Sequence, residues 1–262
     1  MIRQNLAVFL LLIMTVCTCH GAAAPPSAPS AGAYSPASFK QIKLLAEQGD
    51  VLAQVELAYF YFQGKGIKQD YAEAAKWLRK AADKGEPLAS YNLGRMYGSG
   101  RGVEKNAAEA VRYYRLAAEA GNADAQTALG IALANGAGCK QDNKEAFSMF
   151  KKASGLGSAR GQALLGKMYA SGTGITQDDK EALRYFRMAA DAGDSDAQTS
   201  LSLAYLAGKG VSKDLKLALF WSELAGERGG EPAKMVRELT SRNLAPDQVE
   251  SAKREAKEWK RK

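Results

Sequence analysis

The chain contains very little histidine and cysteine. Its single histidine, His20, and two of its three cysteines, Cys17 and Cys19, lie in the first twenty residues, so only Cys139 remains further along. Histidine is the commonest general base and metal ligand, and a single cysteine cannot form an intrachain disulfide. These absences exclude a disulfide framework and any histidine-based site in the body of the chain.

Proline is also scarce outside one segment. Four of the seven prolines fall within residues 24–38, where large apolar side chains are almost absent. Such a segment buries too little surface to offset the entropy lost on ordering it. We therefore predict a flexible linker over residues 24–38.

Residues 1–23 have the features of a secretory signal peptide. Arg3 supplies a positive charge, residues 6–16 form a short apolar run, and small residues follow it. The run is too short for a good permanent membrane span. We predict a periplasmic or secreted protein. A lipoprotein cut at Cys17 or Cys19 is less favoured, because the residues before both cysteines fit that cleavage pattern poorly.

The positive charge is concentrated at the end of the chain. The net charge is +8, and residues 251–262 hold six basic and two acidic side chains. The body is only mildly basic, so we expect no nucleic-acid partner. Residues 246–262 have apolar positions along one helical face, which predicts a basic C-terminal cap helix. Attachment to lipid or cell wall through this tail is the alternative.

Glycine, by contrast, is abundant and periodic. One series recurs every 36 residues as Gly-x-Gly, and a second series recurs with the same step. The two series are Gly64/Gly66, Gly100/Gly102, Gly136/Gly138, Gly172/Gly174 and Gly208/Gly210, and Gly49, Gly85, Gly121, Gly157, Gly193 and Gly229. A fixed period of this length predicts an all-α, right-handed α-solenoid of tandem 36-residue helical hairpins.

Capping residues predict two helices in each repeat. Asp50 and its equivalents follow the second glycine series and suit the N-cap of a first helix. Asp70 and its equivalents precede a second helix, and Glu73 stands three residues later, as in a capping box. The first glycine of each Gly-x-Gly is expected to end the first helix in a left-handed conformation.

Apolar rows repeat with the same step. Leu57 and its equivalents stand in the first helix beside a small residue, and a large residue such as Trp77 recurs between alanines in the second helix. Small residues let helix axes approach, and the large side chain opposite fills the space. One hairpin cannot bury both faces, so the repeats are expected to stack.

These residues resemble the Sel-one-like repeat family, a relative of the tetratricopeptide repeat. Its pattern A-x-x-x-L-G-x-x-Y-x-x-G-x-G-V-x-x-D-x-x-x-A-x-x-(W/Y)-(Y/F)-x-x-A-A-x-x-G is nearly intact at residues 53–85 and 89–121. The resemblance implies a repeat array over residues 39–245, with five full repeats and cap helices. It implies a scaffold or adaptor for envelope assembly, signalling or host interaction, with no cofactor.

The sequence offers little for catalysis. Cys139 occupies a position filled elsewhere by Ile or Val, which indicates a small buried hydrophobe rather than a nucleophile. The recurrent acidic residues serve helix caps, no metal-ligand spacing occurs, and the Gly-x-Gly pairs lie between helices rather than at a phosphate-binding turn. We predict that the protein is not an enzyme. A hydrolase acting on cell-wall or β-lactam substrates is the alternative, as claimed for some exported relatives.

Binding residues are expected where rows vary between repeats. The resemblance implies that one face of each first helix lines a concave groove, which we predict binds a protein or peptide. The candidates there are Tyr59, Phe62, Tyr91, Arg95 and Lys167, since Tyr and Arg are enriched at binding hot spots. The alternative for Tyr59 and Phe62 is packing under the N-terminal cap helix.

Overall fold

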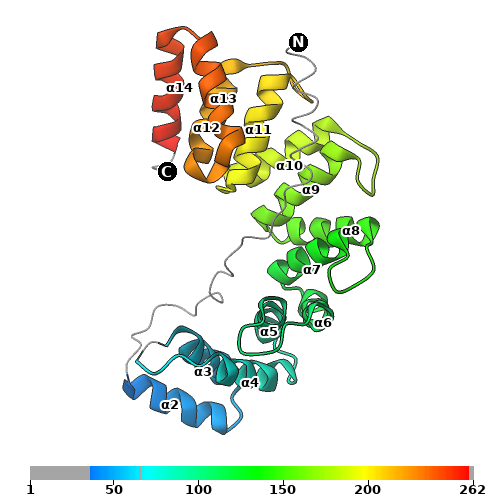
Figure 1. The fold of residues 1–262 in the computed structure, drawn as a ribbon, viewed down its shortest axis with the longest axis vertical. Helices are drawn as coiled ribbons and strands as arrows, with labels where there is room; N and C mark the ends of the chain where they lie inside the picture. The colour runs from blue at the N-terminus through cyan, green and yellow to red at the C-terminus, as the bar shows by residue number, and fades with distance from the viewer. Residues whose placement is uncertain (1–35, 65, 260–262) are drawn as a thin grey trace.

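The protein is a curved stack of antiparallel helical hairpins (Figure 1). The computed structural model describes residues 36–64 and 66–259. The helices are α2 (Pro36–Glu47), α3 (Val51–Gln63), α4 (Tyr71–Ala82), α5 (Pro87–Ser99), α6 (Ala107–Glu119), α7 (Ala123–Asn135), α8 (Asn143–Gly155), α9 (Ala159–Ser171), α10 (Asp179–Asp191), α11 (Ser195–Ala207), α12 (Leu215–Ala225), η1 (Gly226–Gly229), α13 (Gly230–Asn243) and α14 (Pro246–Trp259). The solenoid prediction is confirmed. The predicted signal peptide and most of the predicted linker lie outside the described residues.

The N-terminal cap helix begins earlier than the sequence predicts. Helix α2 starts at Pro36, so residues 36–38 belong to the helix and not to the linker. Proline suits the first helical position, because its missing N–H would have no partner inside the helix.

Side-chain caps begin both helices of each repeat. Asp50 accepts a hydrogen bond from the Ala53 amide at 2.7 Å at the start of α3. Asp70 accepts one from the Glu73 amide at 2.9 Å at the start of α4. Each first helix ends at a glycine with left-handed dihedrals, as at Gly64 with φ 68°. Both capping predictions are confirmed.

The second hydrogen bond of a capping box, from the amide of the cap residue to the carboxylate three residues later, does not form at α4. The Asp70 amide donates to the Tyr61 carbonyl of α3 at 2.9 Å, so it is not held by the Glu73 carboxylate. Glu73 forms an ion pair with Lys76 instead. The cap amide ties the loop back to the preceding helix, a partner that only the folded hairpin supplies.

The second glycine of each Gly-x-Gly allows close backbone approach between repeats. At Gly102 an added Cβ would lie 2.2 Å from the carbonyl oxygen of Tyr71, at the start of the previous repeat's second helix. A Cβ added at Gly138 would lie at the same distance from the Ala107 carbonyl oxygen. A Cβ added at Gly66, in the first repeat, would meet no described atom within 4 Å. These loops therefore stack each repeat on the one before it.

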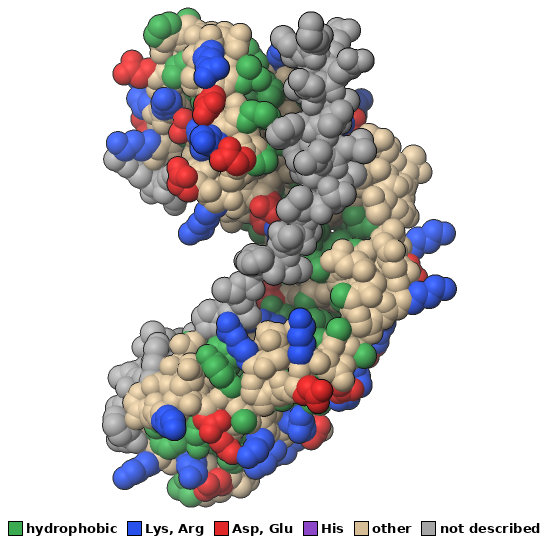
Figure 2. Space-filling model, in the orientation of Figure 1, with side chains coloured by type: hydrophobic (Ala, Val, Ile, Leu, Met, Phe, Trp, Pro, Cys, Tyr) green, Lys and Arg blue, Asp and Glu red, His purple; other side chains and the backbone are tan. Residues whose placement is uncertain are grey.

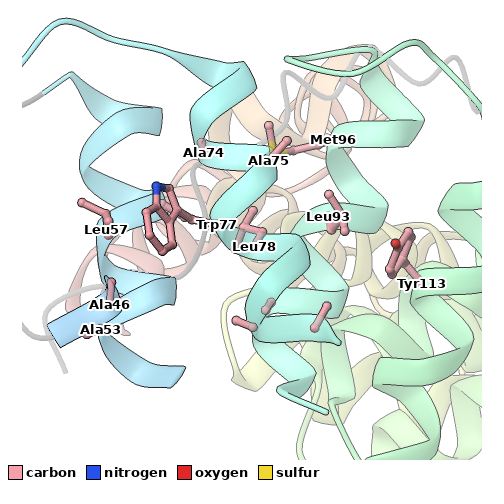
Figure 3. Close-up of a cluster of buried hydrophobic side chains, with 14 residues drawn as sticks. Ala46, Ala53, Leu57, Ala74, Ala75, Trp77, Leu78, Leu93, Met96 and Tyr113 are labelled. Atoms are coloured by element: carbon pink, nitrogen blue, oxygen red, sulfur yellow. The ribbon is translucent and has the colours of Figure 1, made fainter. Parts of the chain in front are cut away.

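The core consists of the apolar rows expected from the sequence. Leu57 is fully buried, and Trp77 lies beside it between α3 and α4 (Figure 3). Where the small residue is Gly94, an added Cβ would lie 2.7 Å from the Tyr114 ring, so the aromatic side chain occupies the space left by glycine. The predicted pairing of small and large residues is confirmed.

The C-terminal end departs from the repeat. Arg237, which replaces the recurring leucine in α13, donates to the carbonyls of Ser222 and Gly226 at 2.8 and 3.2 Å. Those carbonyls lie at the end of α12, where helices leave acceptors with free lone pairs; the Ser222 carbonyl also accepts from the Gly226 amide, so Arg237 is its second donor. Val236, one residue earlier, is fully buried in place of the missing leucine.

Helix α14 covers α12, as the sequence predicts for a cap. Its alanines Ala252 and Ala256 are buried, and the Trp259 ring lies 6.0 Å from that of Phe220. Lys216 of α12 pairs with Glu255 at 2.8 Å. No helix in the described part of the chain is both long and apolar enough to cross a membrane.

Candidate functional site

The first helices of the repeats line the inner side of the curve. Helix α7 contacts α9 and α11 contacts α13, and these pairs are first helices of successive repeats. Charged side chains bridge α9 and α11 directly. In a curved stack, equivalent helices of successive repeats lie closer together on the inner side than on the outer side. The contacts between first helices therefore place them on the inner side. Figure 2 shows the hollowed side of the molecule.

Two of the five predicted residues, Tyr91 and Arg95, come together in α5. The guanidinium carbon of Arg95 lies 5.6 Å from the centre of the Tyr91 ring. The Tyr91 ring lies 6.1 Å from that of Tyr114 on α6. We call Tyr91, Arg95 and Tyr114 the tyrosine–arginine cluster. It combines a cation with two aromatic rings, a set enriched in binding hot spots.

Both tyrosines of this cluster are protonated at neutral pH, and burial moves their pKa values further from neutrality. Burial raises the pKa of Tyr114 to about 12, with a smaller contribution from Tyr91. Burial also raises the pKa of Tyr91, and Arg95 partly opposes that shift. At neutral pH both phenols are therefore hydrogen-bond donors, and Arg95 carries the cluster's charge.

Lys167 lies in a second cluster, two repeats further along. Its ammonium lies 3.3 Å from the Asp196 carboxylate of α11, and the Arg160 guanidinium lies 2.6 Å from the same carboxylate. Burial would raise the pKa of Asp196, but Lys167 and Arg160 outweigh it and hold that pKa below its usual value. We call these three residues the ion-pair cluster; with two cations and one carboxylate it carries a net charge of about +1.

Tyr59 and Phe62 are less accessible to a binding partner than the sequence predicts. Tyr59 is only 7% exposed. The Phe62 ring packs edge-on against Tyr71 of α4 at 5.0 Å. Phe39 of the cap helix α2 contacts the rings of Phe60 and Tyr61. The aromatic side chains at this end of the groove therefore take part in packing within the first repeat and against α2.

Sequence reasoning missed Tyr114, Arg160 and Asp196. A signal for the last two was present, because Asp124, Arg160 and Asp196 stand 36 residues apart with alternating charge. Opposite charges at one position of successive repeats face each other when the repeats stack. Tyr114 gave no such signal, since it lies in a second helix and its ring packs over Gly94 of α5.

Cys139 is half-buried and belongs to neither cluster. It packs against the core of the middle repeats, and burial raises the pKa of its thiol while Arg115 opposes the shift. The thiol therefore stays protonated at neutral pH, the opposite of an activated nucleophile. Among the described residues, no three His, Cys, Asp or Glu side chains are grouped so as to hold a metal ion.

The fold and the repeat pattern place the chain in a known family. The Sel1 repeat model matches residues 51–86, 87–122, 123–158, 159–194 and 195–230, so the chain belongs to the Sel1 repeat family. Sel1 repeats generally form scaffolds for protein–protein interaction.

Solved structures agree with this assignment. The chain is similar to a protective antigen of uropathogenic Escherichia coli with an SLR fold, at 31% identity and a TM-score of 0.79 over 85% of this chain. It spans only 48% of that antigen's length. It also resembles a Sel1 repeat protein from Oxalobacter formigenes, at 29% identity and a TM-score of 0.69, over 84% of this chain and 99% of the other. No curated protein matches the chain.

Proposed function

We propose that this chain is an exported scaffold that binds a protein or peptide partner on its concave face, in an envelope-associated assembly, signalling or host-interaction role. The observation that carries the proposal is the presence of Tyr91 and Arg95 on α5 and of the ion-pair cluster on α9 and α11, all of which are first helices. The core rows repeat along the array, whereas Arg95 and Lys167 stand in a row that also holds Ile131 and Leu203. A row whose side chains differ from repeat to repeat is not part of the repeating core, and this supports a role for Arg95 and Lys167 in recognition.

Export is supported by the sequence of residues 1–23. Their charged start, apolar run and following small residues fit a cleaved leader. The lipoprotein alternative predicts a lipid on Cys17 or Cys19, so mass spectrometry of the purified protein's N-terminus distinguishes the two.

The test is an affinity capture from envelope extract with matched charge reversals in repeat two. Arg95→Glu changes the concave face. Arg112→Glu is the control, because Arg112 lies 4.1 Å over the Tyr113 ring on the other helix of the same hairpin. We expect a partner that wild type and Arg112→Glu retain and Arg95→Glu loses.

The outcomes separate the alternatives. Equal capture by both variants would show that the partner binds elsewhere, and absence of any captured protein would contradict the adaptor role. Attachment through the tail predicts that deleting residues 251–262 changes fractionation. Ala252 and Ala256 of α14 pack against α12, so α14 keeps little apolar surface that could bind a membrane. No observation favours the hydrolase alternative.

A further inference from the structure

The concave face carries charges of alternating sign. Asp124, Arg160 and Asp196 hold the same position in three successive first helices, α7, α9 and α11 (Figure 1). Lys167 of α9 pairs with Asp196 of α11, so its row meets the Asp124 row across neighbouring repeats. Arg95 stands in the row of Lys167, two repeats earlier. From α5 to α11 the concave face therefore presents Arg95, then Asp124, then the ion-pair cluster.

The charges of α5 and α7 lie close enough to act on one side chain. Burial has the largest effect on the pKa of the Tyr91 phenol and raises it. Of the two smaller effects, Arg95 lowers that pKa and Asp124 raises it. Two opposite charges from successive first helices thus lie near Tyr91, which agrees with the order that the repeat gives them.

The carboxylates of this face are unevenly paired. Asp196 holds two cations, with the Arg160 guanidinium at 2.6 Å and the Lys167 ammonium at 3.3 Å. Asp124 is exposed, and no lysine or arginine among the described residues forms an ion pair with it. Arg160 therefore reaches forward to α11 and not back to α7. One carboxylate stands without an ion pair, next to a cluster with an excess of positive charge.

The helix dipole explains an acidic residue at this position but not its lack of a cation. Asp124 lies in the first turn of α7, where a negative charge is stabilised. Asp196 lies in the first turn of α11 in the same way, and it nevertheless forms two ion pairs. The open carboxylate at α7 is therefore a place where a partner can supply the cation.

The spacing of the repeats determines the spacing that such a partner needs. Packed helices lie about 8–10 Å apart, and an extended chain advances about 3.3 Å per residue. One repeat therefore corresponds to about three residues of an extended peptide. A face with charges in the order positive, negative, positive is matched by acidic, basic and acidic side chains with that spacing. The pattern is the same when read from either end, so the peptide fits in both directions.

We propose that the concave face of repeats two to five binds an extended partner segment with an acidic, a basic and an acidic side chain, each about three residues from the next. The basic side chain pairs with Asp124, and the acidic ones pair with Arg95 and with the ion-pair cluster. Exposed ion pairs add little affinity, so these charges decide which segment binds and in which register. The inference rests on the proposed function, because it gives the chemistry of the partner on the same face.

The test is selection of peptides from a displayed random library on the purified protein. Peptides of about nine residues cover the distance from α5 to α11. Wild type should enrich sequences with the acidic, basic, acidic pattern, and Asp124→Lys should enrich an acidic residue in the middle instead. Asp247→Lys is the matched control, because Asp247 is also exposed in the first turn of a helix but belongs to the cap helix α14. It should enrich the same sequences as wild type.

Fluorescence anisotropy then measures the central pair directly. One enriched peptide is compared with its counterpart in which the central basic residue is changed to glutamate. The basic peptide should bind wild type about three- to tenfold more tightly than Asp124→Lys, and the glutamate peptide should show the reverse order. Both differences should shrink at high salt, because salt screens exposed charges.

The outcomes distinguish this inference from the proposed function. Peptides that bind wild type and Asp124→Lys equally but are lost in Arg95→Glu would overturn the charge pattern and keep the concave face as the binding site. Enriched peptides without alternating charges would overturn it as well. If wild type enriches no peptide, both the inference and the proposed function are contradicted. Circular dichroism checks that each variant keeps its helices.

Discussion

The stacking of the repeats can be tested at the second glycine of Gly-x-Gly. Gly66 and Gly102 have nearly the same backbone conformation, with φ of 75° and 71°. They differ in their surroundings, because an added Cβ meets open space at Gly66 but would lie 2.2 and 2.3 Å from the carbonyl oxygen and carbon of Tyr71 at Gly102. Alanine at both positions therefore separates the cost of the conformation from the cost of the contact.

The expected magnitudes follow from those two contributions. Alanine in a left-handed conformation costs about 1–2 kcal/mol, and the smaller entropy of the unfolded chain returns about 0.4–1 kcal/mol. Gly66→Ala should thus destabilise by about 0–1.6 kcal/mol. Gly102→Ala must also move backbone from backbone by about an ångström, an overpacking cost of about 1–3 kcal/mol, so its total should reach about 2–4 kcal/mol.

The assay is equilibrium unfolding in urea followed by helical circular dichroism, combined with hydrogen exchange of the α4 amides. Gly102→Ala should lower the midpoint clearly more than Gly66→Ala and should raise exchange at the start of α4. Repeat arrays do not always unfold in a single cooperative step. The exchange data therefore show whether the loss of stability is confined to the neighbourhood of residue 102. Equal midpoints for the two variants would refute the idea that loop stacking holds successive repeats together.

Further predictions concern the ion pairs, the C-terminal cap and the middle of the array. The pKa of Asp196 is lowered in the folded state. The ion pairs of Asp196 therefore stabilise the fold fully above the pKa of this carboxyl in the unfolded chain, near about 4. That stabilisation is lost as the pH falls through the lower pKa of the folded state. Asp196→Asn should therefore lose less stability than wild type between about pH 5 and 3 in urea titrations, and an unchanged pH profile would contradict the role of the pair. Trp259→Ala removes ring contacts at 6.0 and 6.1 Å and should cost about 1–2 kcal/mol, seen as faster exchange in α12 and α14; unchanged exchange would show that α14 docks without it. Arg237→Met, which keeps the apolar stem but donates no hydrogen bond, should cost about 1–3 kcal/mol, whereas a change under about 0.5 kcal/mol would mean that water replaces the guanidinium. Amides of residues 148–158, where glycine lowers helix stability, should exchange faster than those of α4; uniform protection would contradict this.

Much of the fold could be predicted because it rests on local chemistry. Asp70 caps α4 and Gly64 ends α3 through contacts within a few residues, which a sequence pattern encodes directly. The site was less predictable. Arg95 and Tyr91 are one helical turn apart and could be paired, but the position of Tyr114 beside them depends on how closely α5 and α6 pack.

The sequence alone determined the period, the two helices of each repeat and the alternation of small and large core residues, since each follows from spacing and side-chain size. The tertiary structure decided which groups meet across repeats. It directs the Asp70 amide to Tyr61 rather than to Glu73, brings Gly102 against the Tyr71 carbonyl, and leaves Leu45 uncovered at one end. Those contacts join residues distant in the chain, and their geometry depends on the angle at which neighbouring hairpins stack.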